Sequence, residues 1–269
     1  MKIIVFAGII LFAFVAPTRA DYDAGLAAYH RGDYVGALYE FKAAAEDGHA
    51  GAQYSLGVMY DRGEGAPQDF TQAAEWFRRA AEQGLAKAQI TLGVYLQRGT
   101  GVAQNFAEAA EWYRNAAEQG EPAAQNNLGA LLQRGKGVTE DYAQAAGWYR
   151  KAAEQDYPAA QYNLGALFQR GKGIPQDYAE AASWYRKAAE QSYPAAQYHL
   201  GVLFQRGKGV PQDDVQAHMW LNLAASGLRQ GKERDMAVEL RDDVASGMTP
   251  GKLAEAQKRA REWAAEHTQ

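Results

Sequence analysis

Arginine returns at one position every 36 residues along this chain, and a row of arginines could bind another molecule. The five are Arg62, Arg98, Arg134, Arg170 and Arg206. An arginine can hold a carboxylate through two hydrogen bonds and can also stack on an aromatic ring. Such a row would suit an extended peptide with acidic groups. Two alternatives stay open, because each arginine could instead pair with the aspartate that starts the next helix or simply face water.

Two further positions of the same repeating unit hold polar or aromatic side chains that could take part in binding. One holds tyrosine in three copies and asparagine in another, and the second is mostly glutamine. The tyrosines could equally serve in packing between repeats. The candidate protein-binding groove comprises Tyr54, Arg62, Gln97, Arg98, Asn126, Gln133, Arg134, Tyr162, Gln169, Arg170, Tyr198, Gln205 and Arg206.

The sequence offers no set of residues that suits catalysis, a metal or a cofactor. Its five histidines are scattered, and no pair has the H-x-x-x-H spacing of a metal site. His199 is interpreted as a solvated or internally satisfied side chain. The glycine loops that hold Lys136, Lys172 and Lys208 lack the Lys-Ser/Thr pair of a phosphate-binding loop. We therefore expect no enzyme activity, no catalytic residue, no metal and no cofactor.

The elements that must position these side chains are predicted by the same period. Leu-Gly returns as Leu56-Gly57, Leu92-Gly93, Leu128-Gly129, Leu164-Gly165 and Leu200-Gly201. A tryptophan returns as Trp76, Trp112, Trp148, Trp184 and Trp220, and its helical spacing among alanines predicts a core position. A fixed period of this length indicates a repeat array, which offers an extended binding surface more readily than a catalytic pocket.

Each unit is predicted to be a helix, a glycine loop, a second helix and a tight turn. Five capping residues in phase predict where the second helices begin, namely Asp69, Asn105, Asp141, Asp177 and Asp213. Pro122, Pro158 and Pro194 suit the first position of the next helices. Gly84 and Gly120 close the turn, while Ser192 in the same place predicts a more strained or differently closed turn. Two non-repeating helices, 232–246 and 250–266, should follow.

The first 20 residues differ from the rest. Lys2 precedes an apolar run from Ile3 to Ala16, and small residues lie before Asp21. A run of about 14 residues is short for a membrane-spanning helix of about 20, so we expect a cleaved secretory signal. Without Lys2 and Arg19 the chain has 26 basic and 32 acidic residues, a net charge of −6. That charge argues against nucleic-acid binding, and the absence of cysteine suits the periplasm or secretion from a bacterium.

These motifs resemble one known family. Ala-x-x-x-Leu-Gly, Gly-x-Gly, a capping Asp and Ala-Ala-x-Trp-Tyr-x-x-Ala-Ala-Glu-Gln-Gly, spaced by 36 residues, are similar to the Sel1-like repeat, a relative of the tetratricopeptide repeat. The resemblance implies an all-α, right-handed α-solenoid and a role as adaptor or scaffold in protein complexes. It also implies that the candidate residues face a concave groove. Some exported members are rich in cysteine and β-lactamase-like, whereas this chain has none.

From the residues and the resemblance together we expect a non-catalytic scaffold of the bacterial envelope that binds an extended protein or peptide. A secreted factor that binds host proteins is the main alternative, and a hydrolase of β-lactams or cell-wall fragments is a weaker one. We expect periplasmic location, with no membrane insertion after cleavage. The expected organisation is a signal peptide (1–20), an N-terminal capping repeat (21–48), five repeats (49–84, 85–120, 121–156, 157–192 and 193–228) and C-terminal capping helices (229–269).

Overall fold

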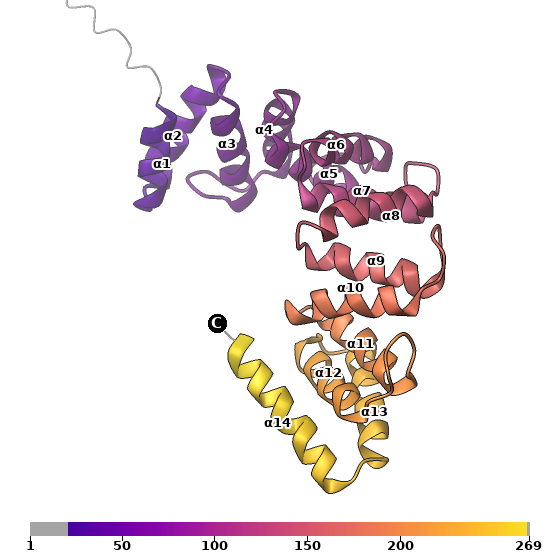
Figure 1. The fold of residues 1–269 in the computed structure, drawn as a ribbon. Coiled ribbons are helices and arrows are strands. Elements are labelled where there is room, and N and C mark those ends of the chain that lie inside the picture. The colour runs from indigo at the N-terminus through magenta and orange to yellow at the C-terminus, as the bar shows by residue number, and fades with distance from the viewer. Residues whose placement is uncertain (1–20, 268–269) are drawn as a thin grey trace, which may run out of the picture. The chain divides into compact units, whose positions relative to one another are not determined.

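The computed structural model describes residues 21–267, and within them it holds fourteen α-helices and no strand (Figure 1). The predicted signal peptide, 1–20, lies outside the described residues. The chain divides into two compact units between Leu85 and Ala86. In each unit the predicted pattern of helix pairs is present, so the all-α fold class is confirmed.

The N-terminal unit consists of two helix pairs. Its elements are α1 (Tyr22–His30), α2 (Tyr34–Glu46), α3 (Ala50–Arg62) and α4 (Phe70–Glu82). Each helix packs on the next one, and Phe41 and Phe77 are fully buried between them.

The C-terminal unit continues the helix pairs and ends in two helices outside the repeat. The pairs are α5 (Ala86–Arg98) with α6 (Phe106–Glu118), α7 (Pro122–Arg134) with α8 (Tyr142–Ala153), α9 (Pro158–Arg170) with α10 (Tyr178–Glu190), and α11 (Pro194–Arg206) with α12 (Asp214–Gly227). The last two helices, α13 (Lys232–Ser246) and α14 (Pro250–His267), both pack against α12. They cover Trp220, whose ring lies 5.8 Å from that of Trp263 on α14.

The second helices begin at the predicted capping residues. The side chain of Asp177, for example, accepts hydrogen bonds from the backbone N–H groups of Ala179 and Glu180, at 2.8 and 3.0 Å. Such a cap satisfies donors that the helix cannot, and its loss typically costs about 1 kcal/mol. The three predicted prolines stand at the first position of α7, α9 and α11.

The glycine of the Leu-Gly pair is required by a close approach between the two helices of a repeat. A Cβ atom on Gly93 would lie 2.5 Å from the ring of Tyr113, and one on Gly129 would lie 2.8 Å from Tyr149. No other side chain fits without moving an aromatic ring that is fully buried. The glycine and the aromatic residue therefore form one packing unit.

The core residue of the second helix is the one after the tryptophan, aromatic in α4, α6, α8 and α10 and leucine in α12, so the prediction about tryptophan is only partly right. Trp76 and Trp220 are buried, at 7% and 5% exposure, but the tryptophans of α6, α8 and α10 are only half-buried. Lys151 and Lys187 lie over the rings of Trp148 and Trp184, both at 4.3 Å. The three tryptophans sit at the edge of the core, and a cation covers the exposed ring face of two of them, Trp148 and Trp184.

A series of buried glutamines joins successive repeats, and the sequence analysis did not single it out. In α9, Gln161 is fully buried and donates to the backbone carbonyl of Ala153 at 3.2 Å, while its own oxygen accepts from Gln191 at 2.9 Å. Gln53, Gln125 and Gln197 make the same type of bond to the preceding helix. A buried amide with satisfied partners fixes the register of neighbouring helices.

The turn at Ser192 is closed in the same way as the glycine turns. Ser192 has φ 61° and Asp156 has φ 58°, both in the left-handed region. The Ser192 N–H bonds the carbonyl of Ala189 at 3.0 Å, as Gly84 bonds Ala81 at 2.9 Å. The expectation of a different closure is therefore wrong. The conformation itself carries the strain of a left-handed serine.

Candidate functional site

The five arginines of the candidate groove are the last residues of the five first helices. Arg62, in the N-terminal unit, has internal partners: it donates to the Tyr29 hydroxyl at 2.9 Å and lies 3.9 Å from Glu64. Tyr29 also donates to Glu64 at 2.7 Å. This arginine therefore belongs to a polar cluster that joins α1 and α3.

The four arginines of the C-terminal unit differ from Arg62. Arg98, Arg134, Arg170 and Arg206 are exposed, and within residues 21–267 they form no hydrogen bond or ion pair. The proposed pairing with capping aspartates is not made. Asp141, for example, accepts from the backbone of Gln144 at 2.8 Å, and this bond lowers the pKa of its carboxyl. The guanidinium groups are therefore available to another molecule.

The first helices of neighbouring repeats lie next to one another, so these arginines form a row. Asn163 of α9 donates to Asn126 of α7 at 2.9 Å. The Tyr162 ring of α9 lies 5.7 Å from the His199 ring of α11. Because each arginine ends its helix in the same register, the row runs across α5, α7, α9 and α11.

Three of the four glutamines beside these arginines hold the two helices of a repeat together, whereas Gln205 donates to Asp243 of α13 at 3.3 Å. The hydroxyl of Tyr149 donates to Gln133 at 2.8 Å, and that of Tyr185 donates to Gln169 at 2.6 Å. Gln97 accepts in the same way from Tyr113, at 3.1 Å. Burial raises the pKa of Tyr113, Tyr149 and Tyr185, and the nearby arginines oppose that rise. These hydroxyls thus stay protonated donors, and the glutamines have a structural role that the sequence did not indicate.

The tyrosines and the asparagine of the candidate set lie on the same face but in different surroundings. Tyr54 packs on Phe77, with ring centroids 5.5 Å apart. It also lines a small cavity of about 190 Å³ in the N-terminal unit, together with Tyr29 and Phe41. Asn126 is engaged by Asn163. Tyr162 and Tyr198 instead line the larger cavity of the C-terminal unit.

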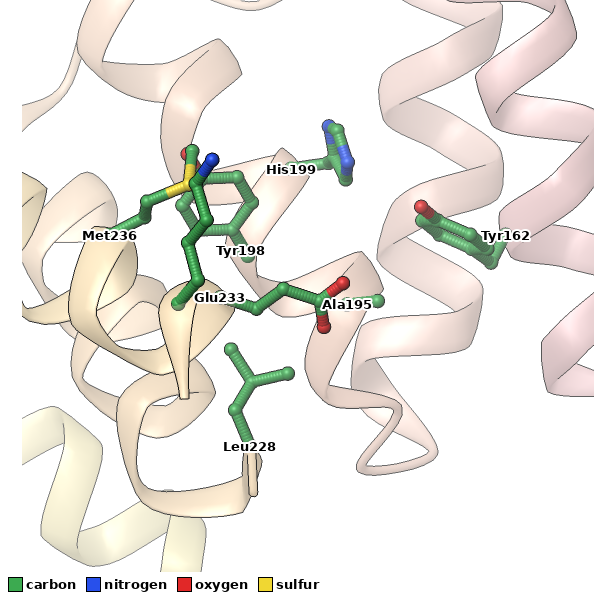
Figure 2. Close-up of a pocket in the computed structure, with 8 residues that line it drawn as sticks. Tyr162, Ala195, Tyr198, His199, Leu228, Glu233 and Met236 are labelled. Carbon is green, nitrogen blue, oxygen red and sulfur yellow. The ribbon is translucent and has the colours of Figure 1, made fainter. Parts of the chain in front are cut away.

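That larger cavity has a volume of about 460 Å³ and is formed by three helices (Figure 2). Tyr162 comes from α9, and Tyr198 and His199 come from α11. The opposite side is formed by Glu233 and Met236 of α13, with Leu228 just before that helix. Sequence reasoning missed α13 because this helix lies outside the repeat. It also undervalued the position of His199, which varies between copies as Ser55, Thr91, Asn127 and Asn163.

His199 is a half-buried, aromatic-stacked side chain and not a solvated one. Its ring stacks on that of Tyr185 at 5.2 Å with an interplanar angle of 18°, and it lies 5.3 Å from that of Tyr198. Burial lowers the pKa of His199 to about 4, and Arg170 adds to this shift. The imidazole is therefore neutral near pH 7, so this wall of the cavity carries no charge there.

Within residues 21–267 no group of three or more histidine, aspartate or glutamate side chains is placed to hold a metal ion. None of the helices there is long and apolar enough to cross a bilayer. The arrangement consists of a row of free guanidinium groups that leads to an aromatic cavity.

The helix pairs, their register and this exposed face define a helical-repeat protein of the solenoid class. The Sel1 repeat family model matches residues 50–85, 86–121, 122–157, 158–193 and 194–227. The chain belongs to the Sel1 repeat family. Proteins of this family are typically non-catalytic scaffolds that mediate protein–protein interactions.

A solved structure agrees with this membership, and two further solved structures are similar to the chain. A Sel1 repeat protein from Oxalobacter formigenes is 30% identical, with a TM-score of 0.77 over 90% of this chain and 97% of that one. A protective antigen of uropathogenic Escherichia coli with the same repeat fold is 25% identical, with a TM-score of 0.38 over 91% and 84%. A Sel1 repeat protein from Klebsiella pneumoniae is 24% identical, with a TM-score of 0.47 over 77% and 99%. No curated protein matches the chain.

Proposed function

We propose that this chain is a non-catalytic scaffold of the bacterial envelope, which binds an extended segment of a partner protein across its first helices. The observation that carries the proposal is the row of exposed arginines without internal partners, Arg98, Arg134, Arg170 and Arg206. A guanidinium can bind a carboxylate through two parallel, charge-assisted hydrogen bonds. Consecutive arginines would therefore fit acidic side chains along an extended partner.

The preformed arrangement of these helices explains how modest contacts could give useful affinity. The tyrosine–glutamine bonds and the buried glutamines hold each first helix in place before a partner arrives. Little ordering is then needed on the side of the scaffold, which removes part of the entropic cost of binding. The partner loses its own freedom, so affinity would depend on how many repeats it contacts.

The envelope location rests on the apolar run at the start of the sequence and on the absence of cysteine. Fractionation of producing cells tests it. Recovery in the periplasmic fraction, with a mature chain that begins at Asp21, is expected. Recovery in the culture medium would instead favour the secreted alternative.

The binding surface is tested by in-cell cross-linking and mass spectrometry of the protein and its variants. Replacing Arg134, Arg170 and Arg206 together by alanine should reduce the cross-linked partner by about tenfold or more, because each lost charge-assisted contact is worth about 1.5–3 kcal/mol when made in full. The helical circular dichroism signal should not change, since these side chains are exposed and internally unpaired.

In a matched control, three arginines of the second helices are replaced, so that the same number of positive charges is lost. Arg114, Arg150 and Arg186 are exposed residues of α6, α8 and α10, and their replacement by alanine should leave the partner yield within about twofold. Equal losses in the two triple variants would show that net charge, and not the row, controls binding.

A further inference from the structure

The cavity between α9, α11 and α13 carries an unpaired carboxylate. Figure 2 shows the side chain of Glu233 extending from α13 toward Ala195, with Tyr162 on the facing side. Glu233 is exposed at the mouth of the cavity, and within residues 21–267 its carboxylate accepts no hydrogen bond and forms no ion pair. Burial is the main cause of the raised pKa of Tyr162 and of Tyr193, and the charge of Glu233 adds to it. An anionic group directed into an aromatic cavity is a binding feature that the repeat does not require.

The walls around this carboxylate suit a long side chain with an apolar stem. Leu228, Ala195 and the thioether of Met236 give an apolar surface, and Met236 is 43% exposed although it is a large hydrophobic residue. The volume of about 460 Å³ lies in the usual range of ligand pockets. A methionine on the rim can adapt its shape to a bound side chain.

The aromatic walls favour a cation over a neutral group. Tyr162 and Tyr198 present rings to the cavity, and the faces of aromatic rings attract cations through their quadrupole. Two cationic side chains lie near the cavity. Lys232 lines it, and the charge of Arg170 lowers the pKa of Tyr162, which burial raises, and that of His199, which burial lowers. Lys232 is exposed, at the start of α13, so its ammonium is free to turn to water. Glu233 is exposed too, but its side chain extends across the cavity toward Ala195, so its carboxylate is the charge that an occupant would neutralise.

We infer that this cavity binds one cationic side chain, an arginine or a lysine, of the partner polypeptide. The guanidinium or ammonium would lie between the Tyr162 ring and the Glu233 carboxylate, with its aliphatic stem on Leu228 and Met236. This inference rests on the proposed scaffold function and adds a direction in which the partner would lie along the repeats. An extended partner would carry acidic groups opposite the arginine row and a basic residue at the α13 end.

The inference is tested with three small probes of equal backbone: N-acetyl-arginine methylamide, its citrulline analogue and its glutamate analogue. Citrulline has nearly the shape of arginine without the charge. The reporter is the ¹³C-labelled methyl group of Met236, assigned by comparison with the Met236→Leu variant. The arginine probe should give a saturable shift, with an affinity at least about fivefold higher than that of citrulline. The glutamate probe should give none.

Two substitutions on α13 and one control test which charged side chain attracts the arginine probe. Glu233→Gln should weaken the arginine probe by about tenfold, whereas Lys232→Gln should leave it unchanged or tighten it. Asp235→Asn is the matched control, because Asp235 lies in the same first turn of α13 but does not line the cavity. Its effect should be less than about twofold.

The inference is overturned by equal shifts from arginine and citrulline, by preferred binding of the glutamate probe, by an unaffected Glu233→Gln variant, or by the absence of any saturable shift. None of these results touches the proposed function, which depends on the cross-linking of the arginine-row variants. Conversely, loss of the arginine-row effect with intact probe binding would leave the cavity as an isolated side-chain site.

Discussion

At the scale of single residues, the surroundings of a side chain matter more than its type. Histidine is an ordinary surface residue, yet His199 is held between Tyr162, Tyr185 and Tyr198. Arg62 and Arg134 occupy the same position of the repeat, but only Arg62 forms a hydrogen bond with a tyrosine and an ion pair with a glutamate. Equivalent positions in an array thus carry different chemistry according to their neighbours.

The stacked histidine makes the stability of the C-terminal unit depend on pH. Its pKa is about 4 in the folded chain and 6.5 in a free side chain. Between these values the unfolded chain takes up a proton that the folded chain does not, so acid favours unfolding. The contribution is fully present above pH 6.5 and is lost progressively down to pH 4, for a total of about 3 kcal/mol.

Replacing His199 by glutamine should remove this part of the acid sensitivity. Urea unfolding at pH 7 and pH 4.5, followed by circular dichroism, should show a smaller drop in the free energy of unfolding for His199→Gln than for the parent. Burial also lowers the pKa of His218. Both proteins keep this residue, so its contribution is the same in each. His30→Gln, at an exposed site of the N-terminal unit, is the control. An equal acid loss in parent and His199→Gln would contradict the assignment.

At the scale of elements, each repeat is held together by contacts between its own two helices. In four repeats the glycine of the first helix fits against a buried aromatic residue of the second, and in three of these a tyrosine–glutamine bond also joins the two helices. The sequence showed both residues as parts of the period but not that they touch. Their contact is the physical reason that Leu-Gly recurs.

A pair of glycine-to-alanine substitutions separates this packing from helix propensity. Gly129→Ala places a Cβ 2.8 Å from the ring of Tyr149 and should destabilise the protein by about 1–3 kcal/mol through overpacking. Gly147→Ala lies in the middle of α8 with nothing within 4 Å of the added atom. It should stabilise the protein by up to about 1 kcal/mol, because alanine has the better helix propensity.

Thermal unfolding followed by circular dichroism measures both changes. The midpoint should fall for Gly129→Ala and rise for Gly147→Ala. If the midpoints of both variants moved in the same direction, the contact with Tyr149 would not be the reason that residue 129 is glycine.

At the scale of the whole molecule, the array must end without exposing its core. In the C-terminal unit, α13 and α14 pack on α12 and cover Trp220 through Trp263. Terminal units with a polar outer face are a general need of repeat proteins. Here α13 also lines the cavity, so one helix takes part both in capping the array and in the proposed side-chain site.

Removal of α14 tests the capping role. A chain that ends at Gly247 should expose Trp220 to water, which shifts tryptophan fluorescence to longer wavelength, and should self-associate in sedimentation experiments at micromolar concentration. The Trp263→Ala variant, which keeps the helix, should show a smaller shift. A monomeric truncated chain with unchanged fluorescence would show that α14 is dispensable as a cap.

The sequence by itself determined the period, the helices, their caps and the proline and glycine positions. These features depend on interactions between residues that are close together in the chain. The same residue types therefore mark them in each copy of the repeat. It also placed the arginines at the ends of the first helices.

Only the tertiary structure decided which aromatic residue is buried, that Gln133 and Gln169 bond tyrosines, and that four arginines stay unpaired. It alone brought Glu233 and Met236 opposite Tyr162. These outcomes depend on how helices far apart in the chain pack together. The period cannot encode the approach of α13, because that helix lies outside the repeat.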